Sequence, residues 1–339
     1  MKHPFVIAEI SANHNGSLNH AKKLIKLAKT QDASAIKLQT YKPETMTINS
    51  NSKRYKINKG LWRGESIWSL YKKAQTPWDW HKELFLYAKR LNITIFSTPF
   101  DTTSVDFLEK LKCPIYKVSS FEMTDLNLIK KIARTKKPMI ISTGLASLKE
   151  IERTFKHAKK NGAKNISLLY CVSNYPANNS DFSLNNINIL KKKFKCTVGL
   201  SDHSQDNKIA IGACAIGAKI FEKHIALKNQ KKGFDLNFSI KGNEIGNYVK
   251  DINDTYKLIQ KKKFFRSTKE IKNKFFRRSV YAIKDIAKGE FFTEKNIKTL
   301  RPALGLGAEY YEDLIGKKNP HKLKMNSPIN NKIFNLKKK

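Results

Sequence analysis

Residues 199–227 read GLSDHSQDNKIAIGACAIGAKIFEKHIAL, two short apolar runs separated by a segment of helical character. A strand, a helix and a second strand in this order are typical of a βαβ unit with parallel strands. His203 closes the first run, and His224 lies near the end of the second. Two interpretations are open: the histidines are joint ligands of one metal ion, or they are polar residues that only end two strands.

The same alternation recurs along most of the chain. Apolar runs rich in Val and Ile predict strands at residues 5–11, 35–40, 94–99, 115–120, 139–144, 166–172, 197–202 and 219–225. Helical periodicity lies between them, at residues 18–31, 77–91, 126–135 and 148–162. Near-continuous apolar strands with helices between them are typical of a parallel sheet buried on both faces. Eight such units over about 260 residues predict an α/β fold, the (β/α)8 TIM barrel, rather than an open doubly wound sheet.

The predicted barrel spans residues 1–262, and a charged linker, 263–278, leads to a small domain, 279–339. Short β-like pieces punctuated by Gly and Pro predict the small domain to be mostly β. A domain of about 60 residues buries little core alone. We therefore expect it to dock on the barrel or on a second subunit.

One connection, residues 42–76, is too long for an ordinary barrel loop. Its length and aromatic content indicate a segment that faces the substrate. Its large aromatic side chains are Tyr55, Trp62, Trp68 and Tyr71.

The composition is typical of a globular protein. Its formal net charge of +38 is extreme. Such a charge raises the possibility of nucleic-acid binding, but the lysines are spread along the chain and form no patch interleaved with aromatic residues. We expect no specific nucleic-acid partner. No apolar run reaches the ~20 residues that span a bilayer, and no signal peptide is evident, so we expect a cytoplasmic protein without membrane association. Cys113, Cys171, Cys196 and Cys214 lack metal-ligand or disulfide spacing and are expected to be reduced.

Polar residues close the predicted strands at the end where a TIM barrel carries its active site. Lys37 and Lys117 lie within otherwise apolar strands, where an unpaired charge is costly to bury. They predict an anionic ligand in the barrel mouth. Hydroxyl groups would add neutral donors around the same anion, from Thr98, Ser120, Ser142 and Ser201.

The histidines gain significance from the barrel topology. Their spacing matches no short metal motif, but the strands that carry His203 and His224 are neighbours, so both imidazoles would reach one rim. Glu9 and Glu222 are close enough in topology to complete a mixed site, because the eighth strand closes onto the first. Such ligands suit Mn²⁺, Fe²⁺, Co²⁺ or Zn²⁺ in an open site.

Seven motifs in order carry a resemblance to a known family. IAEISANHNG, IKLQT, FSTPFD, YKVSSFE, IISTG, GLSDH and FEKH resemble those of the sialic acid synthase family, and RPALGLG resembles the arginine stretch of its C-terminal SAF (antifreeze-like) domain. Ser11, Phe121 and the segment LWRGESIWSLYKKAQTPWDWH are most similar to the pseudaminic acid branch. The resemblance implies a metal-dependent transferase that condenses phosphoenolpyruvate with 2,4-diacetamido-2,4,6-trideoxy-L-altrose. Synthesis of N-acetylneuraminate or legionaminate on the same scaffold is the alternative.

The resemblance also implies roles for individual residues. His203 and His224 match the metal-binding pair, with Mn²⁺ expected and Mg²⁺ or Co²⁺ as alternatives. Glu9 and Glu122 match candidates for orienting or deprotonating the attacking water. The phosphoenolpyruvate positions match Lys37, Thr98, Lys117, Ser120, Ser142 and Ser201. The sugar positions match Gln39, Tyr175, Asp235 and Arg301.

The resemblance implies a domain-swapped homodimer, in which Arg301 enters the barrel of the partner subunit. One departure concerns an Asn of the family, which falls on Ser173 here, with Asn174 one place later.

The apolar end of a deoxy sugar predicts an aromatic cover, for which the candidates are Trp62, Trp68, Tyr71, Trp78 and Trp80. For Trp78 and Trp80 the alternative is packing at the start of a helix. Two rival functions are an enzyme that uses a phosphorylated aldose or acts as a metal-dependent aldolase, and a nucleic-acid-binding protein with an inactive barrel.

Overall fold

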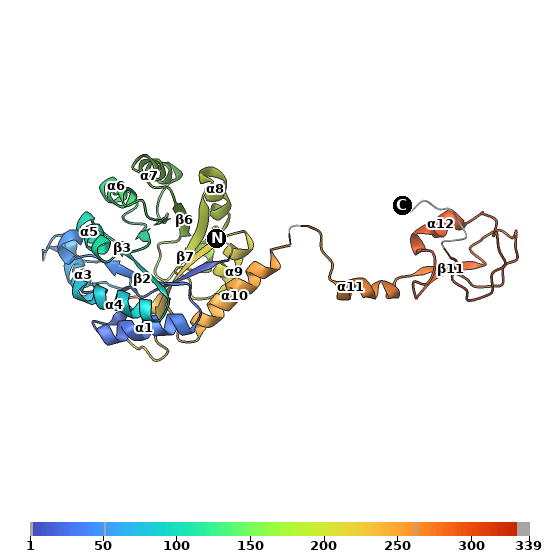
Figure 1. Ribbon diagram of the computed structural model, residues 1–339, viewed down its shortest axis with the longest axis horizontal. Coiled ribbons are helices and arrows are strands. Elements are labelled where there is room, and N and C mark those ends of the chain that lie inside the picture. The colour runs from blue at the N-terminus through green and yellow to red at the C-terminus, as the bar shows by residue number, and fades with distance from the viewer. Residues whose placement is uncertain (1–2, 51, 262, 331–339) are drawn as a thin grey trace. The chain divides into compact units, whose positions relative to one another are not determined.

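The computed structural model describes residues 3–50, 52–261 and 263–330 (Figure 1). The chain divides into two compact units, Met1–Gln260 and Lys261–Lys339. The predicted linker and domain boundaries remain predictions, and each unit is described by itself. Within the described residues, no helix has the length and apolar character needed to cross a membrane.

A closed parallel barrel forms the first unit, which confirms the predicted fold. In the described residues the sheet follows chain order from β1 to β9, and β1 also pairs with β8, so the first eight strands close on themselves. The short β9 extends β8 outside this ring. The strands are β1 Phe5–Glu9, β2 Ala35–Thr40, β3 Thr94–Pro99, β4 Tyr116–Val118, β5 Met139–Ser142, β6 Ile166–Cys171, β7 Thr197–Asp202, β8 Ile220–Ala226 and β9 Ile240–Lys241.

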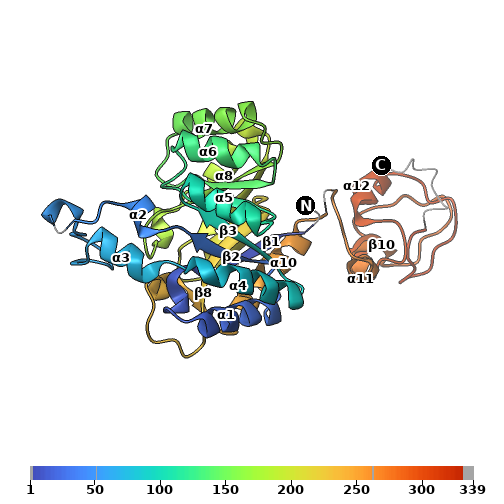
Figure 2. The ribbon, with the colours of Figure 1, turned by 60° about the vertical axis from the view of Figure 1, so that its left-hand side comes forward.

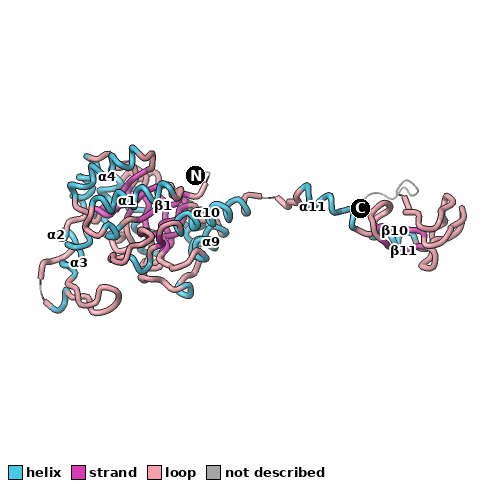
Figure 3. The backbone as a smooth tube through the Cα atoms, turned by 90° about the horizontal axis from the view of Figure 1, so that it is seen from below, coloured by secondary structure: helices cyan, strands magenta, loops and turns pink. Residues whose placement is uncertain are grey.

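The helices surround the strands, as Figures 1 and 3 show. Several begin at a side-chain cap, such as Ser17, Asp101 and Asp125, and Ser147 forms a capping box with Glu150. These caps satisfy backbone N–H groups that a helix start leaves unpaired. The helices of this unit are α1 Leu18–Thr30, α2 Pro43–Met46, α3 Ile67–Ala74, α4 Trp78–Arg90, α5 Thr102–Lys110, α6 Leu126–Arg134, α7 Leu148–Lys160, α8 Asn185–Phe194, α9 Lys208–Ala215 and α10 Glu244–Leu258.

The core lies between the outer surface of the barrel and the inner faces of the helices. Helix α6 shows the pattern: Leu128, Ile129, Ile132 and Ala133 are buried at helical spacing. Burial of each large apolar side chain contributes about 2 kcal/mol of stability, and together these contributions hold such helices on the strands. The strand residues face this layer or the barrel interior, so they are almost continuously buried.

The long connection between β2 and α4 contains α2 and α3 rather than only loop. Figures 2 and 3 show both helices at one edge of the barrel, outside its ring of longer helices. Ser66 caps α3 by accepting a hydrogen bond from the Ser69 N–H at 3.0 Å. The two short helices α2 and α3 therefore lie beside the barrel at this edge.

The second unit has a small core of its own. The strands β10 Ser279–Ala282 and β11 Ile297–Leu300 pair in antiparallel fashion. The helices are α11 Thr268–Lys272 and α12 Tyr311–Leu314. Buried apolar side chains from across the unit pack together, among them Val280, Phe292, Leu314 and Ile329.

Candidate functional site

A small cavity of about 60 Å³ lies at the carboxyl ends of the barrel strands. Parallel register places residues from successive strands beside one another: Gln39 opposite Thr98, and Ser201 opposite Glu222. The structure thus brings together side chains that are far apart in sequence. The predicted residues that line this cavity are Lys37, Gln39, Thr98, Lys117, Ser120, Ser142, Tyr175, Ser201, His203, Glu222 and His224.

The two buried lysines already face carboxylates of the protein. Lys37 forms an ion pair with Glu9 and lies 3.9 Å from Glu222, and Lys117 lies 3.8 Å from the same Glu222 oxygen. From the sequence we expected a ligand alone to compensate these charges. The structure corrects this expectation, because Glu9 and Glu222 compensate part of them. Burial lowers the pKa of Lys117, whereas Glu222 and Glu9 raise the pKa of Lys37 against the effect of burial.

Glu9 lies below the cavity, fully buried at the end of β1. Its carboxylate accepts a hydrogen bond from the Ser11 N–H at 2.6 Å. Burial raises the pKa of Glu9 to about 7, while Lys37 and Glu222 act in opposite directions on it. Lys117 and Lys37, in contrast, hold the pKa of Glu222 low against the effect of burial.

Unsatisfied polar atoms point to a missing polar ligand. In the described part of the chain, the buried Ser142 hydroxyl and Glu222 Oε2 have no hydrogen-bond partner. Leaving such groups unpaired costs about 1–3 kcal/mol each. Gly144 lets two hydroxyl groups pack close to the backbone at this corner, because a Cβ there would lie 2.2 Å from Ser173 Oγ and 2.8 Å from Ser120 Oγ. The arrangement favours an occupant that accepts and donates several hydrogen bonds.

The two histidines meet at the same rim. Their ring centroids are 5.5 Å apart. His203 Nδ1 donates a hydrogen bond to the Val172 carbonyl at 2.9 Å, so the Nε2 lone pair is left open. His224 Nδ1 is buried without a hydrogen-bond partner among the described residues and lies 3.8 Å from Asp235 Oδ2. Burial lowers the pKa of His224 well below its usual value, so this imidazole is neutral.

These donors fit an open metal site. The described residues contain no group of three or more His, Cys, Asp or Glu side chains placed to hold an ion. Two imidazole nitrogens beside the Asp235 carboxylate nevertheless suit a divalent cation whose other ligands are water or substrate. The orphaned His224 Nδ1 is the observation that supports this fit.

A second, larger cavity of about 450 Å³ adjoins the first. The two share Gln39, Tyr175 and His224 in their linings. Asp235 and Ser173 also line the larger cavity, whereas Asn174 donates a hydrogen bond to Asp181 at the surface. At the position where the family has an Asn, Ser173 is therefore placed to contact a ligand in the larger cavity, and Asn174 is not.

Apolar side chains make up much of the larger cavity. The predicted Trp62 and Tyr71 line it, together with residues that the sequence did not indicate: Tyr41, Ile57, Ile67, Leu70, Ala74, Phe100, Phe234 and Phe238. Phe238 packs 4.8 Å from the His224 ring and 5.8 Å from the His203 ring. It ends a three-residue 3-10 helix, Leu236–Phe238, which is too short for periodicity to have revealed it.

Three of the predicted aromatic side chains lie elsewhere. Trp68 and Trp78 line a separate surface hollow, and Trp78 stacks on Phe107 at 4.3 Å. Trp80 packs against His14 at 5.5 Å. The alternative of packing at the start of a helix therefore agrees with the contacts of Trp78 and Trp80, and Trp68 does not line the larger cavity.

Glu122 and Arg301, like Glu9, lie outside both cavity linings. Glu122 follows β4 and accepts a hydrogen bond from Ser119, which lines both cavities. Burial raises the pKa of Glu122 to about 7. Arg301 is an exposed residue of the second unit. Its predicted place near a sugar remains a prediction.

A closed parallel barrel with charged and hydroxyl groups at the carboxyl ends of its strands defines the chain as a TIM-barrel protein of enzyme type. Residues 24–264 match the NeuB family, and residues 277–332 match the SAF domain. The chain therefore belongs to the NeuB family; its relatives there include synthases, and it is an enzyme.

Individual relatives agree with this assignment over most of the chain. The pseudaminic acid synthase of Helicobacter pylori is 41% identical over 96% of both chains. The N,N′-diacetyllegionaminic acid synthase of Campylobacter jejuni is 40% identical over 94% of this chain and 96% of its own. The N-acetylneuraminic acid synthetase of Leptospira borgpetersenii, solved in complex with citrate, has 31% identity and a TM-score of 0.71, covering 80% of this chain and 90% of its own.

Proposed function

We propose that the protein condenses phosphoenolpyruvate with 2,4-diacetamido-2,4,6-trideoxy-L-altrose to give pseudaminic acid and phosphate, as a transferase. The observation that carries this proposal is the pairing of a lysine- and hydroxyl-lined cavity with a larger, mostly apolar one. The first suits the phosphate and carboxylate of phosphoenolpyruvate. The second suits a sugar that ends in a methyl group. The similarity to the Helicobacter enzyme supports this choice, and a legionaminate or N-acetylneuraminate product is the alternative.

In the proposed reaction, C3 of phosphoenolpyruvate attacks the aldehyde carbon of the open-chain sugar, whose oxygen takes up a proton. The cation left at C2 adds water, and the water loses its proton to Glu122 or Glu9. The resulting tetrahedral intermediate releases phosphate by cleavage of its C–O bond. Lys37 and Lys117 hold the phosphate and carboxylate throughout. A divalent cation at His203 and His224, proposed as Mn²⁺ with Mg²⁺ or Co²⁺ as alternatives, would supply Lewis-acid polarisation of the aldehyde.

The direct test is phosphate release from phosphoenolpyruvate in the presence of Mn²⁺. Three sugars are compared, each with and without chelator: the diacetamido altrose, the legionaminate precursor and N-acetylmannosamine. Chelator-sensitive turnover of the altrose compound supports the proposal. Preference for either other sugar would replace the product, and turnover only with a phosphorylated aldose would replace the reaction class.

Glu122→Gln is expected to lower kcat by about 100-fold, within the range typical of a general base. The base acts only when deprotonated, and burial raises its pKa to about 7. Wild-type kcat should therefore rise as the pH passes upward through about 7, and this limb should disappear in the variant. The pH profile of kcat measures both effects. An unchanged limb in Glu122→Gln would assign the base role to Glu9.

Leu70→Asn is expected to reduce the preference for a 6-deoxy sugar over its 6-hydroxy analogue by about tenfold, the worth of one apolar contact. Leu70 lines the larger cavity on α3. The ratio of kcat/KM values for the two sugars measures the effect. Ile48→Asn is the matched control, because Ile48 lies on the same connection but is 62% exposed. Equal ratios in both variants would contradict a sugar-facing role of α3.

Arg301→Ala is expected to raise the KM for the sugar more than the KM for phosphoenolpyruvate. If Arg301 enters the barrel of a second subunit, a mixture of Arg301→Ala and His203→Ala chains should recover activity. Random pairing would give roughly a quarter of wild-type activity, because half of the dimers are mixed and each has one complete site. No recovery above the separate variants would contradict the domain-swapped homodimer.

A further inference from the structure

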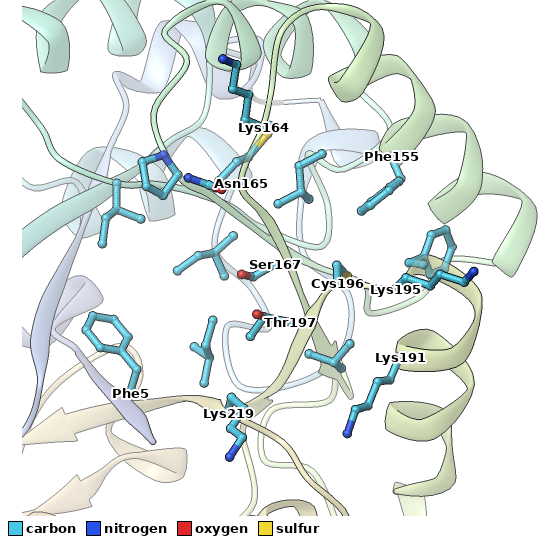
Figure 4. Close-up of a pocket in the computed structure, with 18 of the residues that line it drawn as sticks. Phe5, Phe155, Lys164, Asn165, Ser167, Lys191, Lys195, Cys196, Thr197 and Lys219 are labelled. Atoms are coloured by element: carbon cyan, nitrogen blue, oxygen red, sulfur yellow. The ribbon is translucent and has the colours of Figure 1, made fainter. Parts of the chain in front are cut away.

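A cavity of about 940 Å³ opens at the other end of the barrel (Figure 4). Its lining includes the first residues of several strands: Phe5 of β1, Met139 of β5, Ile166 of β6, Thr197 of β7 and Ile220 of β8. It therefore lies at the amino ends of the strands, opposite the site described above. Residues of α7 and α8, among them Lys159 and Lys191, complete the lining, so the cavity is an open hollow at the base of the barrel.

The cavity floor combines aromatic and hydroxyl groups. Phe5, Phe155 and Phe194 contribute aromatic rings; Phe155 and Phe194 are buried and pack against each other at 5.1 Å, whereas Phe5 is partly exposed. Figure 4 shows the hydroxyls of Ser167 and Thr197 near the centre of the opening. Such a floor can stack a flat ring and hydrogen-bond polar groups attached to it.

Lysines occupy the rim without acidic partners. No carboxylate lines the cavity, and in the described part of the chain none of these lysines forms an ion pair. Lys193 lies on α8 together with the rim residue Lys191, but it differs from the rim lysines because it pairs with Glu152 at 2.9 Å. Lys159 and Lys219 lie over the rings of Phe155 and Tyr256, at 4.9 and 4.0 Å; these cation–π contacts are attractive but supply no formal negative charge. The rim lysines are Lys159, Lys164, Lys191, Lys195 and Lys219.

We propose that this cavity binds a nucleoside polyphosphate. Phosphate groups would meet the lysine rim, where several ammonium groups share a multiply charged anion. The base would lie against the partly exposed ring of Phe5, since stacking on an aromatic side chain accepts any base. The volume falls at the upper end of the range for small-molecule sites. This inference concerns binding alone and does not depend on the proposed reaction.

The test measures binding of ATP, tripolyphosphate and adenosine to the full chain by calorimetry at physiological salt. ATP should bind more tightly than either part. Lys159→Glu combined with Lys191→Glu should weaken ATP binding at least about tenfold, because two rim charges are reversed. The matched control, Lys160→Glu with Lys192→Glu, changes the net charge equally at exposed neighbouring positions and should change affinity less than about twofold. Phosphate release by both variants reports that the barrel is folded.

Three results would overturn the proposal: no binding of ATP, equal weakening in the two charge-reversal variants, or tripolyphosphate binding as tightly as ATP. The last two would identify the effect as attraction of polyanions to a strongly basic protein. A second readout places the ligand. Cys196 lines this cavity and Cys171 lines the catalytic one. ATP should slow alkylation of Cys196 and leave Cys171 unchanged, as peptide mass spectrometry would measure; protection of Cys171 instead would place the nucleotide at the other end.

Discussion

His203→Ala or His224→Ala is expected to lower phosphate release by about 1000-fold or more, equivalent to about 4 kcal/mol of transition-state stabilisation. The ring centroids lie 5.5 Å apart at one rim. Among the described residues, His203 Nε2 and His224 Nδ1 have no hydrogen-bond partner, so each can offer a lone pair to a metal ion. Each variant should also retain less Mn²⁺ after gel filtration. Metal content therefore provides a readout that is independent of turnover.

His321→Ala is the control for these variants, because His321 is an exposed residue of the second unit. It should keep wild-type activity and metal content. The thermal unfolding midpoint of all three variants checks that the barrel is intact. Full activity in either barrel variant would refute the metal assignment and restore the interpretation of both histidines as strand-ending polar residues.

Lys117→Met is expected to reduce kcat/KM for phosphoenolpyruvate by at least about 100-fold, or about 3 kcal/mol, the cost of removing a buried charge from an anion site. The fold should survive. Glu222 would lose a cation at 3.8 Å but would keep Lys37 at 3.9 Å, so its buried carboxylate is not left alone. Steady-state kinetics with phosphoenolpyruvate as the varied substrate, together with urea unfolding, separates the two effects.

Lys110→Met provides the matched control, since it removes the same charge from an exposed position at the end of α5. It should leave kcat/KM unchanged. If Lys117→Met instead raised the KM for the sugar and left phosphoenolpyruvate kinetics intact, Lys117 would be a neighbour of the sugar rather than of the anion.

The barrel could be predicted from sequence because its signals are local. A strand buried on both faces is apolar over its whole length, so the runs at residues 35–40, 94–99 and 197–202 match β2, β3 and β7 at both ends. Side-chain caps such as Ser147 fixed helix starts in the same local way. The short strand β4, which ends at Val118 rather than at residue 120, shows where this reasoning loses accuracy. Ser119 and Ser120 are in the cavity lining and not in the ladder.

Part of the site followed from topology. Polar residues that close parallel strands meet at one end of a barrel, which is why Lys37, Thr98, Ser142 and His203 could be grouped in advance. The internal compensation of the lysines by Glu9 and Glu222 could not be predicted in the same way. It depends on distances of a few ångströms across the barrel interior.

The amino-acid sequence by itself determined the alternation of strands and helices, the closed barrel and the set of groups at its mouth, because periodicity and strand-end position are properties of the chain. Tertiary structure alone decided which aromatic residues face the site: Trp62 and Tyr71 do, whereas Trp68, Trp78 and Trp80 do not. It also decided the unpartnered lysine rim at the opposite end. The physical reason is that side-chain direction and charge compensation depend on neighbours brought together by packing, which no local pattern in the chain records.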